Sequence, residues 1–171
     1  FTASTDNIKS LNFMVDDTET TFEKDNDSWV KKDETDFPVN QSTLDSAASA
    51  VASIESDRVL DDVDDLAEYG LDSPSNTIKI VTKPDDEDGD DTTTTLYVGD
   101  ENSSTSQYYI KKDDDDKTVY LVDSSCVEPF TKTLNEYAQM EDFPAISSTE
   151  TITKISVDGD KSYKLTKNAD T

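Results

Sequence analysis

The stretch TIKIVTKPDDEDGDDTTTTLYV, Thr77–Val98, decides the fold class of this chain. Both of its ends alternate apolar and polar residues, with Ile78 and Ile80 in the first and Leu96 and Val98 in the second. A period of two is typical of half-buried β-strands. The acidic residues and the glycine between the two ends are turn formers, so we predict two antiparallel strands joined by a long solvated turn.

The same alternation recurs on both sides of this hairpin. The strands predicted in this way are Ile8–Val15, Thr20–Lys24, Ser28–Val30, Thr77–Thr82, Thr93–Val98, Gln107–Lys111 and Thr118–Val122. The connections between them are rich in Asp, Ser, Asn and Gly, which favours an antiparallel sheet made of hairpins and a meander. Trp29, the only tryptophan, is expected to pack in the core or on the face of this sheet.

One segment has the spacing of an amphipathic helix instead. Its apolar residues fall on one helix face, and they are Leu44, Ala47, Ala48, Val51 and Ile54. Asn40 precedes the stripe, and its side chain suits an N-cap. This pattern is the clearest helix signal in the chain.

A second amphipathic helix is predicted over Ser125–Met140, where Phe130, Leu134 and Tyr137 share one face. Pro129 lies inside this segment and favours a kink or a separate first turn. Together these elements predict an α+β fold, an antiparallel β-sheet with two main amphipathic helices packed on one face.

A short helix is also predicted, at Asp64–Tyr69. Gly70 suits the left-handed position that ends a helix, and Leu71 is expected to fold back onto Leu66. Pro74 prevents the helix from continuing.

The chain is predicted to contain a single α+β domain, residues 1–145, followed by a C-terminal β-hairpin, residues 146–171. In the hairpin, Ile152, Ile155 and Val157 repeat the apolar spacing of the first predicted strand. Two interpretations stay open at this point. The hairpin completes the sheet of the domain, or it starts a truncated second repeat.

The charge balance excludes several classes of function. The chain has 171 residues with 40 Asp and Glu against 15 Lys and Arg, a formal net charge of −25, no histidine and one cysteine. A surface this negative repels nucleic-acid backbones and anionic bilayers. Without histidine there is no Ser-His-Asp triad and no histidine zinc ligand, and Cys126 alone makes no intrachain disulfide.

The densest acidic run offers candidate metal ligands, namely Asp85, Asp86, Asp88 and Asp90. Hard cations such as Ca²⁺ take several carboxylate oxygens, and a glycine permits a sharp turn. The EF-hand spacing does not fit, because Gly89 at position 6 places Pro84 at position 1 and Thr95 at position 12. We therefore expect a solvated turn, with weak, non-selective Ca²⁺ binding as the alternative. No catalytic residue and no cofactor are predicted.

Five stretches resemble the family called domain of unknown function 4340. They are TFEKDNDSW (21–29), FPVNQSTLDSAASAV (37–51), DDLAEYGLDSP (64–74), LYVGDEN (96–102) and TVYLVDSS (118–125), in that order along the chain. The resemblance implies a bacterial extracytoplasmic protein with an N-terminal membrane-spanning segment or lipid anchor. It also implies an auxiliary role beside export-type ABC transporters or similar envelope machinery, and it supplies no catalytic motif.

The expected function is therefore a non-enzymatic, membrane-tethered accessory or interaction domain on the cell surface of a bacterium. No apolar run approaches the roughly 18 residues of a membrane-spanning helix, and the chain starts with Phe1 rather than Met, so we expect the anchor in a preceding segment. The alternative function is a module that binds divalent cations or the cell wall through its acidic loops.

Overall fold

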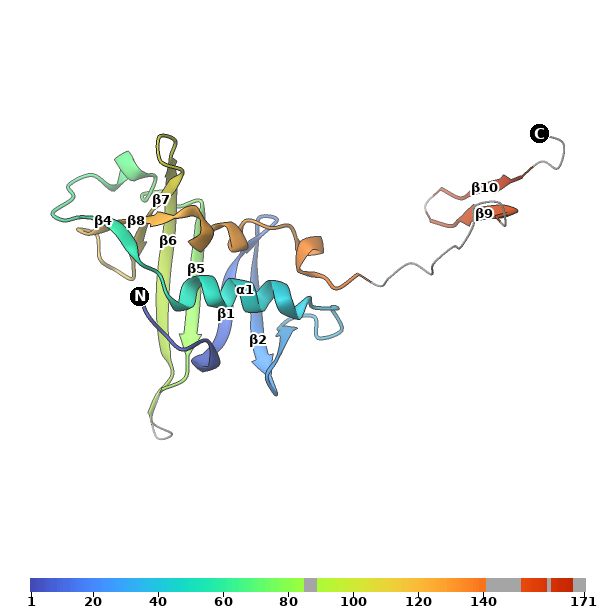
Figure 1. Cartoon of the computed structure of the whole chain (residues 1–171), viewed down its shortest axis with the longest axis horizontal. Coiled ribbons are helices and arrows are strands. Elements are labelled where there is room, and N and C mark those ends of the chain that lie inside the picture. The colour runs from blue at the N-terminus through green and yellow to red at the C-terminus, as the bar shows by residue number, and fades with distance from the viewer. Residues whose placement is uncertain (85–88, 141–151, 160, 168–171) are drawn as a thin grey trace. The chain divides into compact units, whose positions relative to one another are not determined.

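A computed structural model describes residues 1–84, 89–140, 152–159 and 161–167 of the protein. The chain forms two units, Phe1–Met140 and Glu141–Thr171. The described part of the larger unit contains an eight-stranded sheet in the order β3-β2-β1-β5-β6-β7-β8-β4 (Figure 1). Its neighbouring strands pair antiparallel throughout, which confirms the predicted α+β class with an antiparallel sheet.

The strands agree closely with the alternating segments of the sequence. They are β1 (Ile8–Val15), β2 (Thr18–Asp25), β3 (Ser28–Lys31), β4 (Ser56–Leu60), β5 (Asn76–Thr82), β6 (Thr92–Asn102), β7 (Gln107–Lys112) and β8 (Val119–Asp123). Strand β4 was not predicted, because its residues SDRVL show no alternation and most of them are exposed. It becomes a strand by pairing with β8 at the edge of the sheet.

The helix α1 (Gln41–Ala52) confirms the first predicted helix. The Asn40 side chain caps it by accepting a hydrogen bond from the Thr43 amide at 3.3 Å. Leu44, Ala47, Ala48 and Val51 are buried against the sheet, while Ile54 lies beyond the helix end and is buried in the following segment. Figure 1 shows α1 crossing one face of the sheet.

The predicted helix at Ser125–Met140 is helical but is not one continuous α-helix. This fully described segment forms short 3-10 turns, η3 (Ser124–Cys126), η4 (Glu128–Phe130) and η5 (Leu134–Tyr137). Pro129 in η4 lacks the amide that a continuing helix needs, and Thr133 starts η5 with its own capping box to Glu136. Phe130 and Tyr137 are still buried on the same side of the sheet as α1.

The main core lies between the sheet and this helical layer. Its centre is a group of aromatic rings, Phe13, Phe22, Phe130 and Tyr137, with centroids 5.0–5.8 Å apart. Trp29 is buried at its edge, as predicted, and its indole N–H donates to Asp45 at 2.9 Å. Burial of these rings supplies much of the hydrophobic stabilisation of a chain with few apolar residues.

A smaller core covers the opposite face of β6, β7 and β8. Tyr97, Tyr109 and Val119 alternate along their strands with residues of the main core, so they lie on the other face. The segment around the 3-10 turn η2 (Leu66–Tyr69) packs on them. It ends as predicted, because Gly70 has φ +68° and the Leu71 amide donates to the Leu66 carbonyl at 3.0 Å.

The smaller unit contains an antiparallel hairpin of β9 (Lys154–Val157) and β10 (Tyr163–Thr166). Ile155 pairs with Leu165 and Val157 pairs with Tyr163, which places four exposed apolar side chains on one face. The domain boundary at residue 145 and both interpretations of this hairpin stay predictions.

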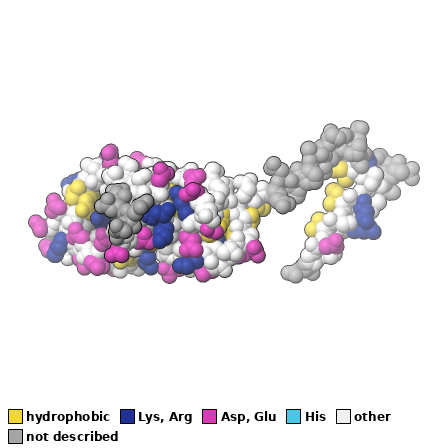
Figure 2. All heavy atoms as spheres, turned by 90° about the horizontal axis from the view of Figure 1, so that it is seen from below, with side chains coloured by type: hydrophobic (Ala, Val, Ile, Leu, Met, Phe, Trp, Pro, Cys, Tyr) yellow, Lys and Arg dark blue, Asp and Glu magenta, His cyan; other side chains and the backbone are white. Residues whose placement is uncertain are grey.

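Acidic side chains are spread over the visible face of the larger unit, interleaved with lysines (Figure 2).

The 3-10 turn η1 (Thr5–Asn7) adds another short helical element at the surface. Among the described residues, no helix is long and apolar enough to cross a bilayer.

Candidate functional site

An open groove with an acidic rim lies at one end of the sheet. Its volume is about 470 Å³. Its carboxylates come from the β1–β2 turn and from strand β6, and they are Asp16, Asp17, Asp100 and Glu101. Its apolar lining comes from β1, β6, β7 and the helical layer, and consists of Met14, Val98, Tyr108, Val127 and Phe130. The groove therefore combines apolar surface with concentrated negative charge.

The tight turn between β1 and β2 positions the first pair of carboxylates. Asp16 and Asp17 have φ of 47° and 61°, the left-handed conformation that hairpin turns require and that Asp tolerates better than most residues. The Asp16 carboxylate accepts a hydrogen bond from the Leu134 amide at 2.9 Å. This bond fixes the turn against η5.

A bulge in β6 positions the second pair. The register between β6 and β7 shifts between Val98 and Glu101, so Gly99 and Asp100 leave the regular ladder. Bulges re-aim side chains at the ends of strands. Here the bulge brings Asp100 and Glu101 to the same groove as the β1–β2 turn.

Asn76 braces the floor of the groove. Its side chain accepts a hydrogen bond from the Met14 amide at 3.0 Å and donates one to the Phe130 carbonyl at 3.0 Å. The residue is 9% exposed. A buried amide side chain with both partners satisfied joins β1, β5 and η4, and this lining residue therefore holds the shape of the groove.

The serine and threonine hydroxyls in the groove are used by the main chain. Ser75 donates to the Val98 carbonyl at 3.1 Å, and Thr131 donates to the Glu128 carbonyl at 3.0 Å. Neither is hydrogen-bonded to a general base. The groove therefore offers shape and charge for binding and no activated nucleophile among its described residues.

The structure describes only one of the four predicted metal candidates, so that prediction stays open. Asp85, Asp86 and Asp88 lie outside the described residues, and Asp90 is exposed. Within the described ranges, no group of three or more His, Cys, Asp or Glu side chains is arranged to hold a metal ion. The four carboxylates of the groove are included in that statement, so they form a rim rather than a metal cage.

Cys126 lies in η3 and is half-buried. Burial raises the pKa of its thiol, and the nearby Asp123 carboxylate raises it further. A thiol is reactive as the thiolate, so this environment lowers its reactivity at neutral pH. The side chain packs against the main core, in agreement with a structural thiol.

The acidic run at 113–116 is the turn that the sequence indicates. Asp115 accepts hydrogen bonds from the amides of Lys117 and Thr118, and these bonds lower the pKa of its carboxyl group. Asp116 forms an ion pair with Lys111, whose ammonium lies 4.8 Å from the centre of the Tyr97 ring. These carboxylates stabilise the hairpin between β7 and β8 and point to no ligand.

Sequence reasoning missed the acidic groove. Each of its acidic pairs was visible as a turn or strand end, but no motif links residues 16–17 to residues 100–101. The antiparallel pairing of β1 with β5 and of β5 with β6 brings them together. That information is in the strand order and not in any local spacing.

A comparison with known families finds a match over most of the chain. The family model described as "Domain of unknown function (DUF4340)" matches residues 29–171. No curated protein and no solved structure matches the chain.

Proposed function

The chain belongs to the DUF4340 family, and on that premise we propose that it is a non-enzymatic interaction domain whose acidic groove binds a basic protein segment. The proposed setting is the outer face of a bacterial membrane, with the domain tethered beside an envelope or ABC-transporter-like system. That setting is supported by the family resemblance alone. The groove is supported by the geometry that follows.

The observation that carries the proposal is the pairing of an apolar lining with a carboxylate rim. Met14 is 36% exposed, and a flexible, polarisable thioether adapts to differently shaped partners. Four carboxylates surround this lining, against one lysine among the lining residues, Lys132. A partner that inserts an apolar side chain flanked by Lys or Arg would match both features.

The rigidity of the groove also supports binding. Asn76 and Asp16 fix its walls through hydrogen bonds to the main chain, so little conformational entropy is lost when a partner binds. Rim charges chiefly accelerate association and select the sign of the partner. The binding we propose is thus specific for positive charge and sensitive to ionic strength.

A first experiment uses a capped peptide of sequence Lys-Phe-Lys-Leu-Lys and its Glu-Phe-Glu-Leu-Glu counterpart, each titrated into the 171-residue chain with NMR detection. We expect shifts at Met14, Val98 and Glu101 with the basic peptide and none with the acidic one. The double variant Asp100→Asn, Glu101→Gln should weaken the basic peptide about 3- to 10-fold.

The matched control is Asp61→Asn, Glu68→Gln, which removes the same charge from another acidic hollow of the surface. It should leave the affinity within about twofold. If both double variants weaken the binding of the basic peptide equally, only the net charge of the protein matters, and the groove is not the binding site.

A second experiment tests the cellular function. The full-length anchored protein is purified from native envelope with and without the Asp100→Asn, Glu101→Gln changes. We expect a transporter or envelope protein to be enriched with the native sequence and lost with the double variant. Identical recovery from both, or enrichment of no such protein, would contradict the proposal.

A further inference from the structure

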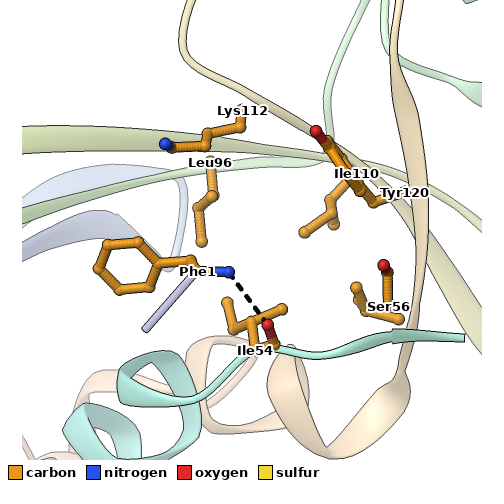
Figure 3. Close-up of a pocket in the computed structure, with 8 residues that line it drawn as sticks. Phe1, Ile54, Ser56, Leu96, Ile110, Lys112 and Tyr120 are labelled. Carbon is orange, nitrogen blue, oxygen red and sulfur yellow. Dashed lines mark hydrogen bonds between the residues drawn. The ribbon is translucent and has the colours of Figure 1, made fainter. Parts of the chain in front are cut away.

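A second hollow lies on the face of the sheet that carries the main core, and it is distinct from the acidic groove (Figure 3). It is a pocket of about 230 Å³. Leu96, Ile110 and Val122 from β6, β7 and β8 form its floor, and Ile54 closes one side. The described residues that line it include none of those that line the acidic groove.

The pocket exists because α1 is too short to cover the whole sheet. A helix of 12 residues is about 18 Å long, whereas eight strands span roughly 34 Å. The floor formed by β6, β7 and β8 is covered instead by Phe1 and by the chain from Ile54 to Ser56. An extended segment packs less completely than a helix face, and a hollow remains.

Phe1 lines one side of this pocket. Its main-chain nitrogen donates to the Ile54 carbonyl at 3.1 Å, and the Ile54 amide donates to the Phe1 carbonyl at 3.0 Å. The Ala3 amide adds a bond to the Ala52 carbonyl at 2.7 Å. In Figure 3 the Phe1 ring lies beside Leu96 and Ile54, at the side of the pocket away from Tyr120 and Ser56.

The charge of the pocket is opposite to that of the molecule. Among the described residues, none with a carboxylate lines it, although the chain carries a net charge of −25. Lys112 stands at its edge, and the hydroxyl-bearing side chains of Ser56 and Tyr120 line the other side (Figure 3). The Lys112 ammonium lies 3.7 Å from the Asp113 carboxylate in an exposed ion pair, which is weak and easily exchanged.

We propose that this pocket binds a small amphiphile, with an apolar body on the Leu96–Ile110–Val122 floor and a carboxylate at Lys112. Its volume lies between that of a cavity that holds benzene, about 150 Å³, and the lower end of drug-sized sites, about 300 Å³. It therefore accepts one aromatic ring with a short side chain, or a short acyl chain. The net negative charge of the molecule disfavours the binding of such acidic ligands to most of the remaining surface.

The experiment is a methyl-NMR titration of the 171-residue chain with phenylpropionate and, separately, with phenylpropanol. We expect saturable shifts at the Leu96, Ile110 and Val122 methyls, with tighter binding of the acid. Lys112→Gln should weaken the acid about 3- to 10-fold and leave the alcohol unchanged. Lys83→Gln, the same charge change at an exposed position outside the pocket, should change neither.

Ser56→Trp provides a test that does not alter the floor. Ser56 is exposed on the edge strand β4, where a large aromatic side chain is tolerated and would fill the mouth of the pocket. It should abolish the methyl shifts. Absence of saturable shifts with the native sequence, or native affinity in Ser56→Trp, would overturn the site, and equal affinity for acid and alcohol would overturn the carboxylate assignment.

Discussion

The main-chain carbonyl oxygen of Tyr69 occupies the space that a side chain at Gly99 would need. A Cβ added at Gly99 would overlap that oxygen and come within 3.0 Å of the Leu71 side chain. Gly70 makes the reciprocal approach, because a Cβ there would lie 2.5 Å from the Asp100 carboxyl group. The family-like stretches 64–74 and 96–102 therefore meet through two glycines, directly behind the acidic groove.

Gly99→Ala is expected to destabilise the larger unit by about 2–4 kcal/mol, because the main chain of Tyr69 must move away. Gly70→Ala combines two penalties. The left-handed φ costs about 1–2 kcal/mol for a residue with a side chain, and the clash of the new Cβ with Asp100 adds to that cost. Urea unfolding followed by Trp29 fluorescence measures both. The control is Gly159→Ala, which meets nothing within 4 Å and should change the free energy of unfolding by less than about 0.5 kcal/mol. An unchanged midpoint for Gly99→Ala would contradict the close approach.

Asn76→Ala should cost about 2–4 kcal/mol of the free energy of unfolding. It leaves the Met14 amide and the Phe130 carbonyl without their side-chain partner in a buried site. Asn12→Ala is the matched control, since Asn12 donates to the hydroxyl of Thr21 in a less buried pair, and it should cost about 1 kcal/mol or less. Similar losses of unfolding free energy in both variants would show that Asn76 contributes no more to stability than a less buried hydrogen-bonded asparagine.

Tyr137 makes stability sensitive to alkaline pH. Burial raises the pKa of its phenol above the ordinary value of about 10, and its hydroxyl donates to the Pro129 carbonyl at 2.5 Å. Because the folded state holds this proton more tightly than the unfolded state, its contribution is fully present below about pH 10 and decreases as the pH rises further. Unfolding free energies measured between pH 8 and 11 should therefore fall less steeply for Tyr137→Phe. Cys126 is present in both proteins, so its own raised pKa cancels in the comparison. Parallel pH profiles would refute the assignment.

Added salt should stabilise the protein. With 40 acidic against 15 basic residues, repulsion outweighs attraction, and exposed pairs such as Lys79–Glu19 are too weak to reverse the balance. The screening length falls from about 30 Å at 0.01 M salt to about 10 Å at 0.1 M. The urea midpoint should rise over this range of sodium chloride, and a decrease would mean that attractive ion pairs dominate.

Calcium tests the alternative function at Asp85, Asp86, Asp88 and Asp90. Because the spacing of this run does not match a calcium loop, we expect flat heats in a calorimetric titration at physiological ionic strength. Saturable binding at micromolar to low-millimolar affinity that is lost in Asp86→Asn, Asp88→Asn would instead establish the cation-binding alternative.

The spacing of apolar residues along the chain predicted most of the fold, because most of the strands bury only one face. The alternation in β5 and β6 and the stripe in α1 report burial directly. Strand β4 has no such pattern, since its strand conformation comes from hydrogen bonds to β8. The segment after β8 reproduces helical spacing with separate 3-10 turns, which periodicity alone does not distinguish from one α-helix.

The site was less accessible to prediction. A single acidic pair at a turn is ordinary, and the groove becomes recognisable only because Asp16 and Asp100 line the same hollow. The apolar pocket depends on the difference between the length of α1 and the width of the sheet. Neither the strand order nor that width can be inferred from the spacing of any one motif.

The strand order also governs how the protein is made. The meander from β5 to β8 closes short loops and can form soon after its residues leave the ribosome. By contrast, two other pairings form only after a much later strand has been synthesised. They join Leu11 on β1 to Ile80 on β5, and Arg58 on β4 to Leu121 on β8. Until then the apolar faces and open edges of the early strands stay exposed to other chains. The complete sheet of the larger unit therefore forms only after β8 has been synthesised.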